Sequence, residues 1–316
     1  MSLVVVAVVA IGGGAAWIAT GSRGDAAAVR PTATATPSAS ATPSPSVSPS
    51  PSRPAVSAPA AGDHALTVQV QGRPRTLILR VPPAAQTGRP LPLALVFHGS
   101  GDSAAEAEAD TNLAPAADSD GFLVAYMQGY EASWNDHNGH TKAQTAGVDD
   151  VAFTAAALTA IERLVPVDTT RVTAVGFSNG ALFVNLLGCS LADRLTALVM
   201  AEGQLSTTVA ASCHPSRPLS VVQVNGTADP TIPYAGGDTT LSGAVVPMLS
   251  ASDAASRWAQ FNGCTGAPTD SSPASDIRLK TYAPCRDGVT VQLRTVDGGG
   301  HDWPDDVAGL VTGTFR

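Results

Sequence analysis

The feature that most constrains the fold of this chain is a serine flanked by glycines, in the pentapeptide Gly176-Phe177-Ser178-Asn179-Gly180. It directly follows the apolar run 171–175, which is typical of a β-strand. A glycine two residues on either side removes side chains that would collide where a strand turns sharply into a helix. Such a turn holds a serine hydroxyl exposed above a sheet. The pattern predicts a strand, a sharp turn and a helix, with Ser178 as a candidate nucleophile.

Two further segments supply the groups that a serine nucleophile needs. An imidazole must remove the hydroxyl proton, and a carboxylate must hold the imidazole in the right tautomer. Asp229 follows the strand-like run 219–224, and His301 follows the strand-like run 289–296 and three glycines. The chain order serine, aspartate, histidine at the ends of strands is that of the α/β-hydrolases. We therefore predict that Ser178, Asp229 and His301 form a catalytic triad.

Each of these assignments has an alternative. Asp229 precedes a proline, and Asp-Pro initiates ordinary turns. His301 could be a surface loop histidine, but the other histidine after the serine, His214, lies between Cys213 and a proline, which is typical of a tethered loop.

An acyl-transfer site also needs hydrogen-bond donors for the developing oxyanion. The backbone N–H of Asn179, directly after the serine, is one candidate. The loop after an early core strand supplies the other in this fold, and the apolar run 91–97 is followed by His98 and a glycine on each side of Ser100. We predict the Ser100 amide as the second donor, and we expect His98 to shape this loop without transferring protons.

Two tryptophans are candidate substrate-binding residues. Trp134 lies in a polar loop after the strand-like run 122–127, where it either stacks on a substrate ring or caps the core. Trp303 follows the candidate catalytic histidine.

Asp149 and Asp150 open the helical run 152–164, where acidic residues suit an N-cap and the helix dipole. The sequence contains no Cys/His pattern with metal-ligand spacing, so we expect no metal site.

The order of the predicted elements indicates the fold class. A β-hairpin around Gly72, over residues 66–81, precedes strands and helices that alternate as far as residue 296. Alternation of this kind predicts an α/β fold with a mostly parallel sheet and helices on both faces. We place one catalytic domain at residues 63–316.

The first part of the chain has a different composition. Residues 3–19 are apolar and uncharged, so residues 1–22 are predicted to be a signal peptide or a membrane anchor, although no Lys or Arg precedes them. Residues 23–62 are rich in Pro, Ser, Thr and Ala, which predicts a disordered linker. We therefore expect an exported protein, extracellular or attached to the cell envelope.

Four cysteines suit an oxidising compartment, and they allow three disulfide pairings. We prefer Cys189 with Cys213 and Cys264 with Cys285, because each pair joins neighbouring segments; buried free thiols are the alternative. The formal net charge of −8 argues against binding to nucleic acid or to an anionic membrane surface. We expect a monomer.

Six blocks of this sequence, in this order, resemble the secreted esterases of the poly(3-hydroxybutyrate) depolymerase and feruloyl esterase family. The blocks are His98-Gly99, Ser133-Trp134-Asn135-Asp136, Val148-Asp149-Asp150-Val151, Gly176-Phe177-Ser178-Asn179-Gly180, Gly226-Thr227-Ala228-Asp229-Pro230 and Gly298-Gly299-Gly300-His301-Asp302-Trp303-Pro304. The resemblance implies an α/β-hydrolase fold and hydrolysis of carboxylic esters through an acyl-enzyme. It also implies that no cofactor takes part, and it assigns the roles of nucleophile, acid and base to Ser178, Asp229 and His301.

The chain departs from the family pattern at two places. Asn225 stands where a histidine is common, which we expect to affect loop packing. Only residues 305–316 follow Pro304, and they contain two glycines. This segment is too short for a good helix on propensity alone, so we expect the last helix of the family to be missing.

The resemblance leaves the substrate open. Feruloyl or acetyl esters of plant polysaccharide are favoured, because no surface-binding domain for a solid polyester is visible in the sequence. Poly(3-hydroxybutyrate) or its oligomers are the alternative. Two alternative functions of other classes stay open. The protein could be a non-catalytic binding protein anchored to the cell envelope, or an acyltransferase that uses the same three residues.

Overall fold

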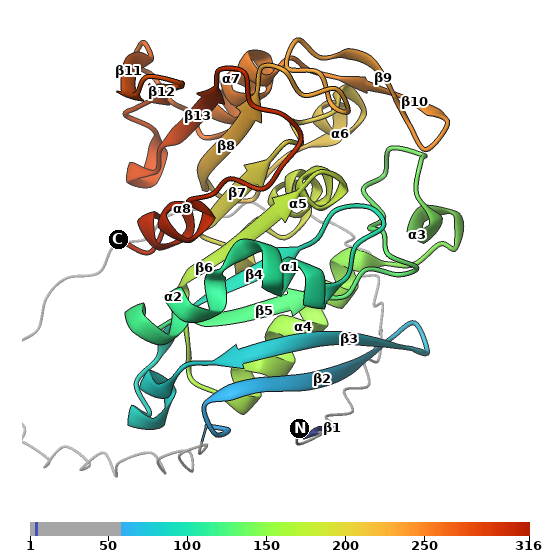
Figure 1. Cartoon of the computed structure of the whole chain (residues 1–316), viewed down its shortest axis with the longest axis vertical. Helices are drawn as coiled ribbons and strands as arrows, with labels where there is room; N and C mark the ends of the chain where they lie inside the picture. Colours follow the sequence, from blue (N-terminus) through green and yellow to red (C-terminus); the bar gives the residue numbers. More distant parts are fainter. Residues whose placement is uncertain (1–3, 6–57) are drawn as a thin grey trace, which may run out of the picture. The chain divides into compact units, whose positions relative to one another are not determined.

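The computed structural model describes residues 4–5 and 58–316. Most of its strands form one sheet in the order β1-β2-β3-β5-β4-β6-β7-β8-β13-β12-β11 (Figure 1). The strands of this sheet are β1 (Val4–Val5), β2 (Gly62–Val70), β3 (Arg73–Val81), β4 (Leu91–Phe97), β5 (Leu123–Met127), β6 (Val167–Phe177), β7 (Ala197–Ala201), β8 (Ser220–Gly226), β11 (Thr269–Ala274), β12 (Ile277–Tyr282) and β13 (Val291–Val296). The remaining pair is the hairpin of β9 (Gly237–Leu241) and β10 (Ala244–Met248).

The centre of the sheet is parallel, and an antiparallel hairpin flanks it on each side; the short β1 then pairs parallel with β2. Neighbouring strands run parallel from β5 through β4, β6, β7 and β8 to β13. The hairpin β2–β3 extends one margin and β12–β11 the other, both antiparallel. All residues of β4, β5 and β7 are buried, because helices cover both faces of the parallel centre. The predicted fold class, a mostly parallel sheet with helices on both faces, is confirmed.

The helices divide between the two faces of the sheet. The structure has α1 (Ala104–Thr111), α2 (Leu113–Asp120), α3 (Lys142–Thr145), α4 (Asp150–Leu164), α5 (Asn179–Ser190), α6 (Thr207–Ser212), α7 (Ala251–Phe261), α8 (Val307–Gly313) and the short 3-10 helices η1 (Pro83–Thr87), η2 (Ala192–Arg194) and η3 (Arg286–Gly288). Most buried apolar residues of α4, α5 and α7 belong to one hydrophobic cluster, and those of α1, α2 and α8 to another.

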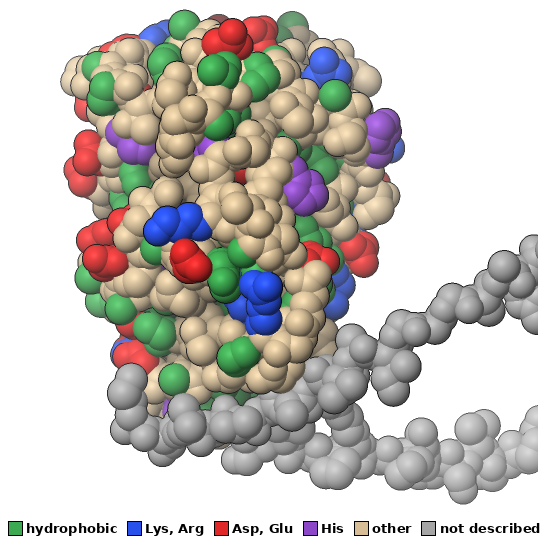
Figure 2. All heavy atoms as spheres, turned by 90° about the vertical axis from the view of Figure 1, so that its right-hand side faces the viewer, with side chains coloured by type: hydrophobic (Ala, Val, Ile, Leu, Met, Phe, Trp, Pro, Cys, Tyr) green, Lys and Arg blue, Asp and Glu red, His purple; other side chains and the backbone are tan. Residues whose placement is uncertain are grey.

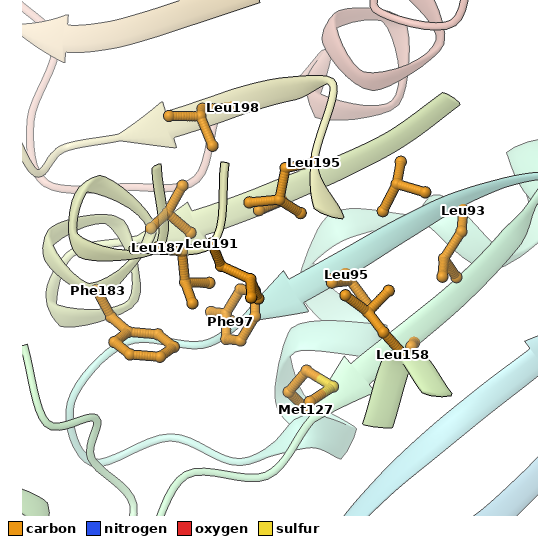
Figure 3. Close-up of a cluster of buried hydrophobic side chains, with 14 of the residues drawn as sticks. Leu93, Leu95, Phe97, Met127, Leu158, Phe183, Leu187, Leu191, Leu195 and Leu198 are labelled. Carbon is orange, nitrogen blue, oxygen red and sulfur yellow. The ribbon is translucent and has the colours of Figure 1, made fainter. Parts of the chain in front are cut away.

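Strand β4 shows how one strand serves both clusters. Leu93, Leu95 and Phe97 pack with α4 and α5, as Figure 3 shows, whereas Ala94 and Val96 pack with α1 and α2. Successive side chains of a strand point to opposite faces, so an uninterrupted apolar run contributes to two cores. This rigid centre holds the ends of the strands that carry the candidate site.

The segment after Pro304 differs from the expectation of a missing last helix. Residues 307–313 form α8, and Val307 and Val311 are buried. The ring of Phe315 lies 5.4 Å from that of Phe122, and the hydroxyls of Thr314 and Thr173 are 2.6 Å apart. The prediction was wrong because it relied on propensity, whereas a short helix is stabilised by the surface on which it packs.

Both disulfides of the structure join neighbouring segments. Cys189 is bonded to Cys213 and Cys264 to Cys285, the pairs that the sequence favours. The predicted leader or anchor lies outside the described residues apart from Val4–Val5, as does the linker up to residue 57. In the part of the chain that the structure describes, no helix has the length and apolar character needed to cross a bilayer.

Candidate active site

Ser178 lies on the sharp turn between β6 and α5. Its φ of 52° and ψ of −122° are unfavourable for a residue with a side chain. The two glycines permit this turn by close packing of backbone. A Cβ atom on Gly176 would lie 2.3 Å from the carbonyl oxygen of Gly180, and one on Gly180 would lie 2.1 Å from that of Phe97. The pentapeptide thus locks the turn against the end of β4.

His301 joins the serine to the aspartate. Its Nε2 lies 2.9 Å from the Ser178 Oγ, and its Nδ1 lies 2.7 Å from an Asp229 carboxylate oxygen. The structure therefore brings together all three residues that the sequence nominates, although 123 positions separate serine from histidine. Nδ1 donates to the carboxylate, which leaves Nε2 free to accept the hydroxyl proton.

Asp229 is held firmly in this position. Its other carboxylate oxygen accepts hydrogen bonds from the backbone N–H groups of Thr231 at 2.7 Å and Ile232 at 2.9 Å. The residue is 6% exposed. It does begin a turn, as its proline neighbour suggests, but the turn leaves one oxygen for His301.

The loops that carry the acid and the histidine are joined along their backbones. Ala228 N–H donates to the Gly299 carbonyl at 2.9 Å, and Gly298 N–H donates to the Thr227 hydroxyl at 2.8 Å. A Cβ atom on Gly226 would lie 2.3 Å from the Gly299 oxygen. This close approach fixes the separation of Asp229 and His301.

The two predicted oxyanion donors are backbone N–H groups, one directly after the serine and one in the loop that follows β4. The amide of Asn179 begins α5 and has no partner within the helix. Within residues 58–316, neither this amide nor that of Ser100 donates to a protein acceptor. Both predicted oxyanion donors are therefore free for a ligand.

His98 holds the loop that carries Ser100. Its ring is fully buried, with Nδ1 2.7 Å from the Gly99 carbonyl and Nε2 accepting from the Gly129 N–H at 3.0 Å. Burial lowers the pKa of His98, so the ring is neutral. These contacts agree with the expectation that His98 shapes the loop.

Trp134 does not face the substrate. The residue is fully buried, its indole N–H donates to the His98 carbonyl at 2.9 Å, and its ring is stacked on Phe183 with 5.4 Å between centroids. Its assignment as a substrate-binding residue is therefore wrong, and the alternative of a core role is correct. A tryptophan with its N–H satisfied adds large apolar area to a core.

Trp303 is half-buried and stacks on Phe177, with 5.2 Å between the centroids. Phe177 in turn contacts the His301 ring at 4.9 Å. Trp303 supports the histidine loop from this side, and a role in substrate binding stays a prediction.

A buried polar cluster that the motif analysis missed supports the serine turn. The amide side chain of Asn179 accepts from the Trp134 N–H at 2.8 Å and donates to Asp136 at 2.9 Å. Asp136 also contacts His140 Nε2 at 2.7 Å. The signals for this cluster in the sequence are the position of Asn179 directly after the serine and the block that contains Trp134 and Asp136.

Asp149 caps α4 as expected, accepting from the Ala152 N–H at 2.8 Å. Asp150 does more than complement the helix dipole. It is buried, pairs with Arg75 at 2.6 Å and accepts from the Asn135 N–H at 2.7 Å. It thereby ties the loop of Trp134 to strand β3.

A second buried carboxyl group lies behind the triad. Glu202 directly follows β7, is 3% exposed and contacts Asp229. Burial raises the pKa of Glu202 to about 8, and the neighbouring carboxylates of Asp229 and Asp302 add to the rise. Glu202 was not among the residues predicted for the site, although a carboxyl group soon after an apolar run is the pattern that identified Asp229. Among the described residues no cluster of His, Cys, Asp or Glu could hold a metal ion.

Several proteins of known name are similar in sequence to much of this chain. No protein-family model matches it. It is 32% identical over 234 residues to Feruloyl esterase B of Piromyces equi, across 72% of this chain and 42% of that protein, so it spans less than half of that relative. It is 31% identical over 253 residues to the "Putative esterase NocK" of Nocardia uniformis subsp. tsuyamanensis, across 75% of this chain and 73% of that protein.

Solved structures with low sequence identity show the same fold. The acetyl xylan esterase from Aspergillus awamori matches with a TM-score of 0.56 at 16% identity, over 76% of this chain and 94% of that one. The S-formylglutathione hydrolase FrmB from Staphylococcus aureus matches with a TM-score of 0.53 at 11% identity, over 82% of this chain and 99% of that one. The likeness to NocK, of which the chain covers 73% at 31% identity, shows that the chain belongs to a family of esterases, and the two solved structures show that its fold is that of the α/β-hydrolases.

Proposed function

We propose that this chain is an exported serine esterase that hydrolyses feruloyl or acetyl esters of plant polysaccharide through an acyl-enzyme. The main support for the proposal is the position of His301. Its Nε2 lies 2.9 Å from Ser178 Oγ, and its Nδ1 lies 2.7 Å from Asp229 Oδ2. This geometry is that of a nucleophile, its base and the group that orients the base.

In the first half of the reaction, Ser178 Oγ attacks the ester carbonyl carbon while His301 Nε2 takes the hydroxyl proton. The carbonyl oxygen becomes an oxyanion, which the amides of Asn179 and Ser100 stabilise. The C–O bond to the alcohol then breaks, and the imidazolium gives its proton to the leaving oxygen. Asp229 stabilises the imidazolium throughout.

In the second half, water replaces the alcohol. His301 accepts a proton from water, and the hydroxide attacks the acyl-serine carbonyl. Collapse of the second oxyanion releases the carboxylic acid and returns the proton to Ser178 Oγ.

The surface beside the loop that carries Ser100 supports the proposal that the alcohol part of the ester substrate bears hydroxyl groups. A cavity of about 850 Å³ lies between this loop, the segment around α3 and the tip of the β9–β10 hairpin. Most of the side chains around it are polar: Ser100, Glu131, Ser133, His140, Thr141, Lys142, Thr145 and Ser242. Figure 2 shows the side of the molecule that carries α3 and this hairpin, where charged side chains, histidines and single hydrophobic side chains are scattered among other side chains and backbone. Sugar hydroxyls find donors and acceptors on such a surface.

The names of the relatives support the proposed feruloyl or acetyl group and the proposed polysaccharide. Two of them carry the names Feruloyl esterase B and Feruloyl esterase D, and another is named a bifunctional acetylxylan esterase/xylanase, from Neocallimastix patriciarum. Export is supported by the two disulfides, which persist in oxidising compartments. We infer that residues 1–22 direct or anchor the chain and that residues 23–62 form a spacer to the catalytic domain.

The test uses the full chain with methyl ferulate, acetylated xylan and a 3-hydroxybutyrate trimer together, with products separated by chromatography. We expect ferulate or acetate to appear first, and the Ser178→Ala variant to release neither. A matched control, Ser119→Ala on the exposed surface of α2, keeps the activity. Hydroxybutyrate released first would overturn the polysaccharide assignment, and full activity in Ser178→Ala would overturn the nucleophile.

A further inference from the structure

Glu202 is a buried acid that the reaction described above does not use. It is the first residue after β7, beside the ends of β6 and β8, which carry Ser178 and Asp229. Its φ of 49° lies in the left-handed region, and its N–H donates to the Val224 carbonyl at 2.9 Å. A non-glycine residue in this conformation is uncommon. The residue is 3% exposed.

The carboxyl group of Glu202 lies between the backbone of β8 and the catalytic acid. Both of its oxygens accept from the Gly226 N–H, at 3.0 and 2.9 Å, and the group contacts the Asp229 carboxyl. Two carboxylates in contact cannot both be ionised without strong repulsion, so the pair shares a proton.

The surroundings decide which of the two acids holds this proton. Asp229 accepts three hydrogen bonds, from the Thr231 and Ile232 amides and from His301 Nδ1. Glu202 accepts from a single N–H, that of Gly226. Burial without compensating donors favours the neutral form, and it raises the pKa of Glu202 to about 8.

We infer that Glu202 is a positioning residue that carries a proton at neutral pH and donates it to Asp229, fixing the carboxylate that orients His301. This inference rests on the proposed esterase function. The triad is thereby extended by a fourth member that touches neither substrate nor the serine. Glu202 adds an O–H donor to Asp229 without adding charge beside the imidazole.

The arrangement makes activity depend on the ionisation of Glu202. Above pH 8 the donor is lost and two negative charges come into contact, so Asp229 is repelled from its position and kcat falls. Besides Asp229, Asp302 on the histidine loop faces Glu202. A cavity of about 560 Å³ that Glu202 borders gives solvent protons a route, and its other charged residues are Asp276, Arg294, Asp302, Asp305 and Asp306.

The test compares Glu202→Gln, Glu202→Ala and the control Asp276→Asn in the full chain, with p-nitrophenyl acetate as substrate between pH 6 and 9.5. Asp276 is exposed and borders the same cavity. A glutamine amide donates to Asp229 and accepts from Gly226 but does not titrate. We therefore expect Glu202→Gln to keep kcat at pH 7 within about threefold and to lose the fall above pH 8. Glu202→Ala lowers kcat by roughly 10–100-fold, because the carboxylate is no longer held in place, with KM almost unchanged.

The control is expected to reproduce the wild-type profile. A fall above pH 8 that persists in Glu202→Gln, or a loss of kcat in Glu202→Gln as large as in Glu202→Ala, overturns the inference. Circular dichroism shows that each variant is folded, and labelling of Ser178 with a fluorophosphonate measures the concentration of active sites. The kcat values therefore refer to intact enzyme.

A second measurement needs no substrate and separates this inference from the proposed function. Infrared difference spectra of the wild type between pH 6 and 9.5 are expected to contain the C=O band of a buried protonated carboxyl group, lost at high pH and absent from Glu202→Gln. If the band is present in a wild type that hydrolyses no ester, the proposed function fails and the proton on Glu202 stands. If the band is missing, the inference fails even where esters are hydrolysed.

Discussion

Individual side chains in this protein act through a few short contacts that burial makes effective. The His301–Asp229 hydrogen bond of 2.7 Å is shielded on the aspartate side, where the carboxylate is buried, and open toward Ser178. In such surroundings a hydrogen bond to a charged group is stronger than one in water. The tautomer of His301 therefore follows from the state of Asp229.

The substitution Asp229→Asn tests this dependence. The amide keeps an oxygen for the Thr231 and Ile232 N–H groups but can present its NH₂ to His301, which favours the wrong tautomer. We expect kcat to fall on the order of 10⁴-fold, the magnitude known for this change in other serine triads. Steady-state kinetics measure the fall, with the exposed Asp110→Asn of α1 as the control that keeps its activity. A loss below tenfold contradicts the assignment of the acid.

The elements of the fold position these side chains through the ends of parallel strands. Strands β6, β8 and β13 bear Ser178, Asp229 and His301 at their carboxyl ends, and β7 bears Glu202 between the first two. Parallel neighbours bring such ends to one edge of the sheet. Tight backbone contact between the loops then sets the distances, as at Gly226 and Gly299.

Replacing Gly226 with alanine tests the loop contact. The added Cβ would lie 2.3 Å from the Gly299 carbonyl oxygen, so the aspartate and histidine loops must separate. We expect kcat to fall by about 10²-fold or more, as for other displacements of about 1 Å in an active site. Kinetics on protein shown to be folded by circular dichroism measure this loss.

Gly309 of α8 provides the matched control, since a Cβ atom there meets no atom within 4 Å. Gly309→Ala is expected to keep the activity and to stabilise the protein by roughly 0.4–1 kcal/mol. Equal activities of the two alanine variants would show that the loops do not need their close contact.

On the scale of the whole molecule, buried ionisable groups couple the stability of the fold to pH. Glu202 has an ordinary pKa in the unfolded chain and a pKa of about 8 in the folded protein, because burial opposes its charge. The folded state therefore binds more protons than the unfolded state between about pH 4.5 and 8. The contribution of Glu202 to stability is complete below this range and is lost as the pH rises through it.

Denaturant unfolding of the wild type and of Glu202→Gln at several pH values measures this linkage. The difference in unfolding free energy between the two proteins should move in favour of the variant as the pH rises from 5 to 9, by a few kcal/mol at most. A difference that is constant with pH would mean that Glu202 ionises at its ordinary pKa.

The sequence by itself determined the α/β fold class and which residues could form a triad. Apolar runs define the strands, and a glycine-flanked serine defines the turn. The carboxyl ends of parallel strands lie at one edge of the sheet, whatever the conformation of the loops that follow them. Only the tertiary structure decided that Trp134 lies in the core, that residues 307–313 form a helix packed against α2, and that Glu202 meets Asp229. These three facts depend on burial and on contacts between segments far apart in the chain, and local periodicity carries no information about either.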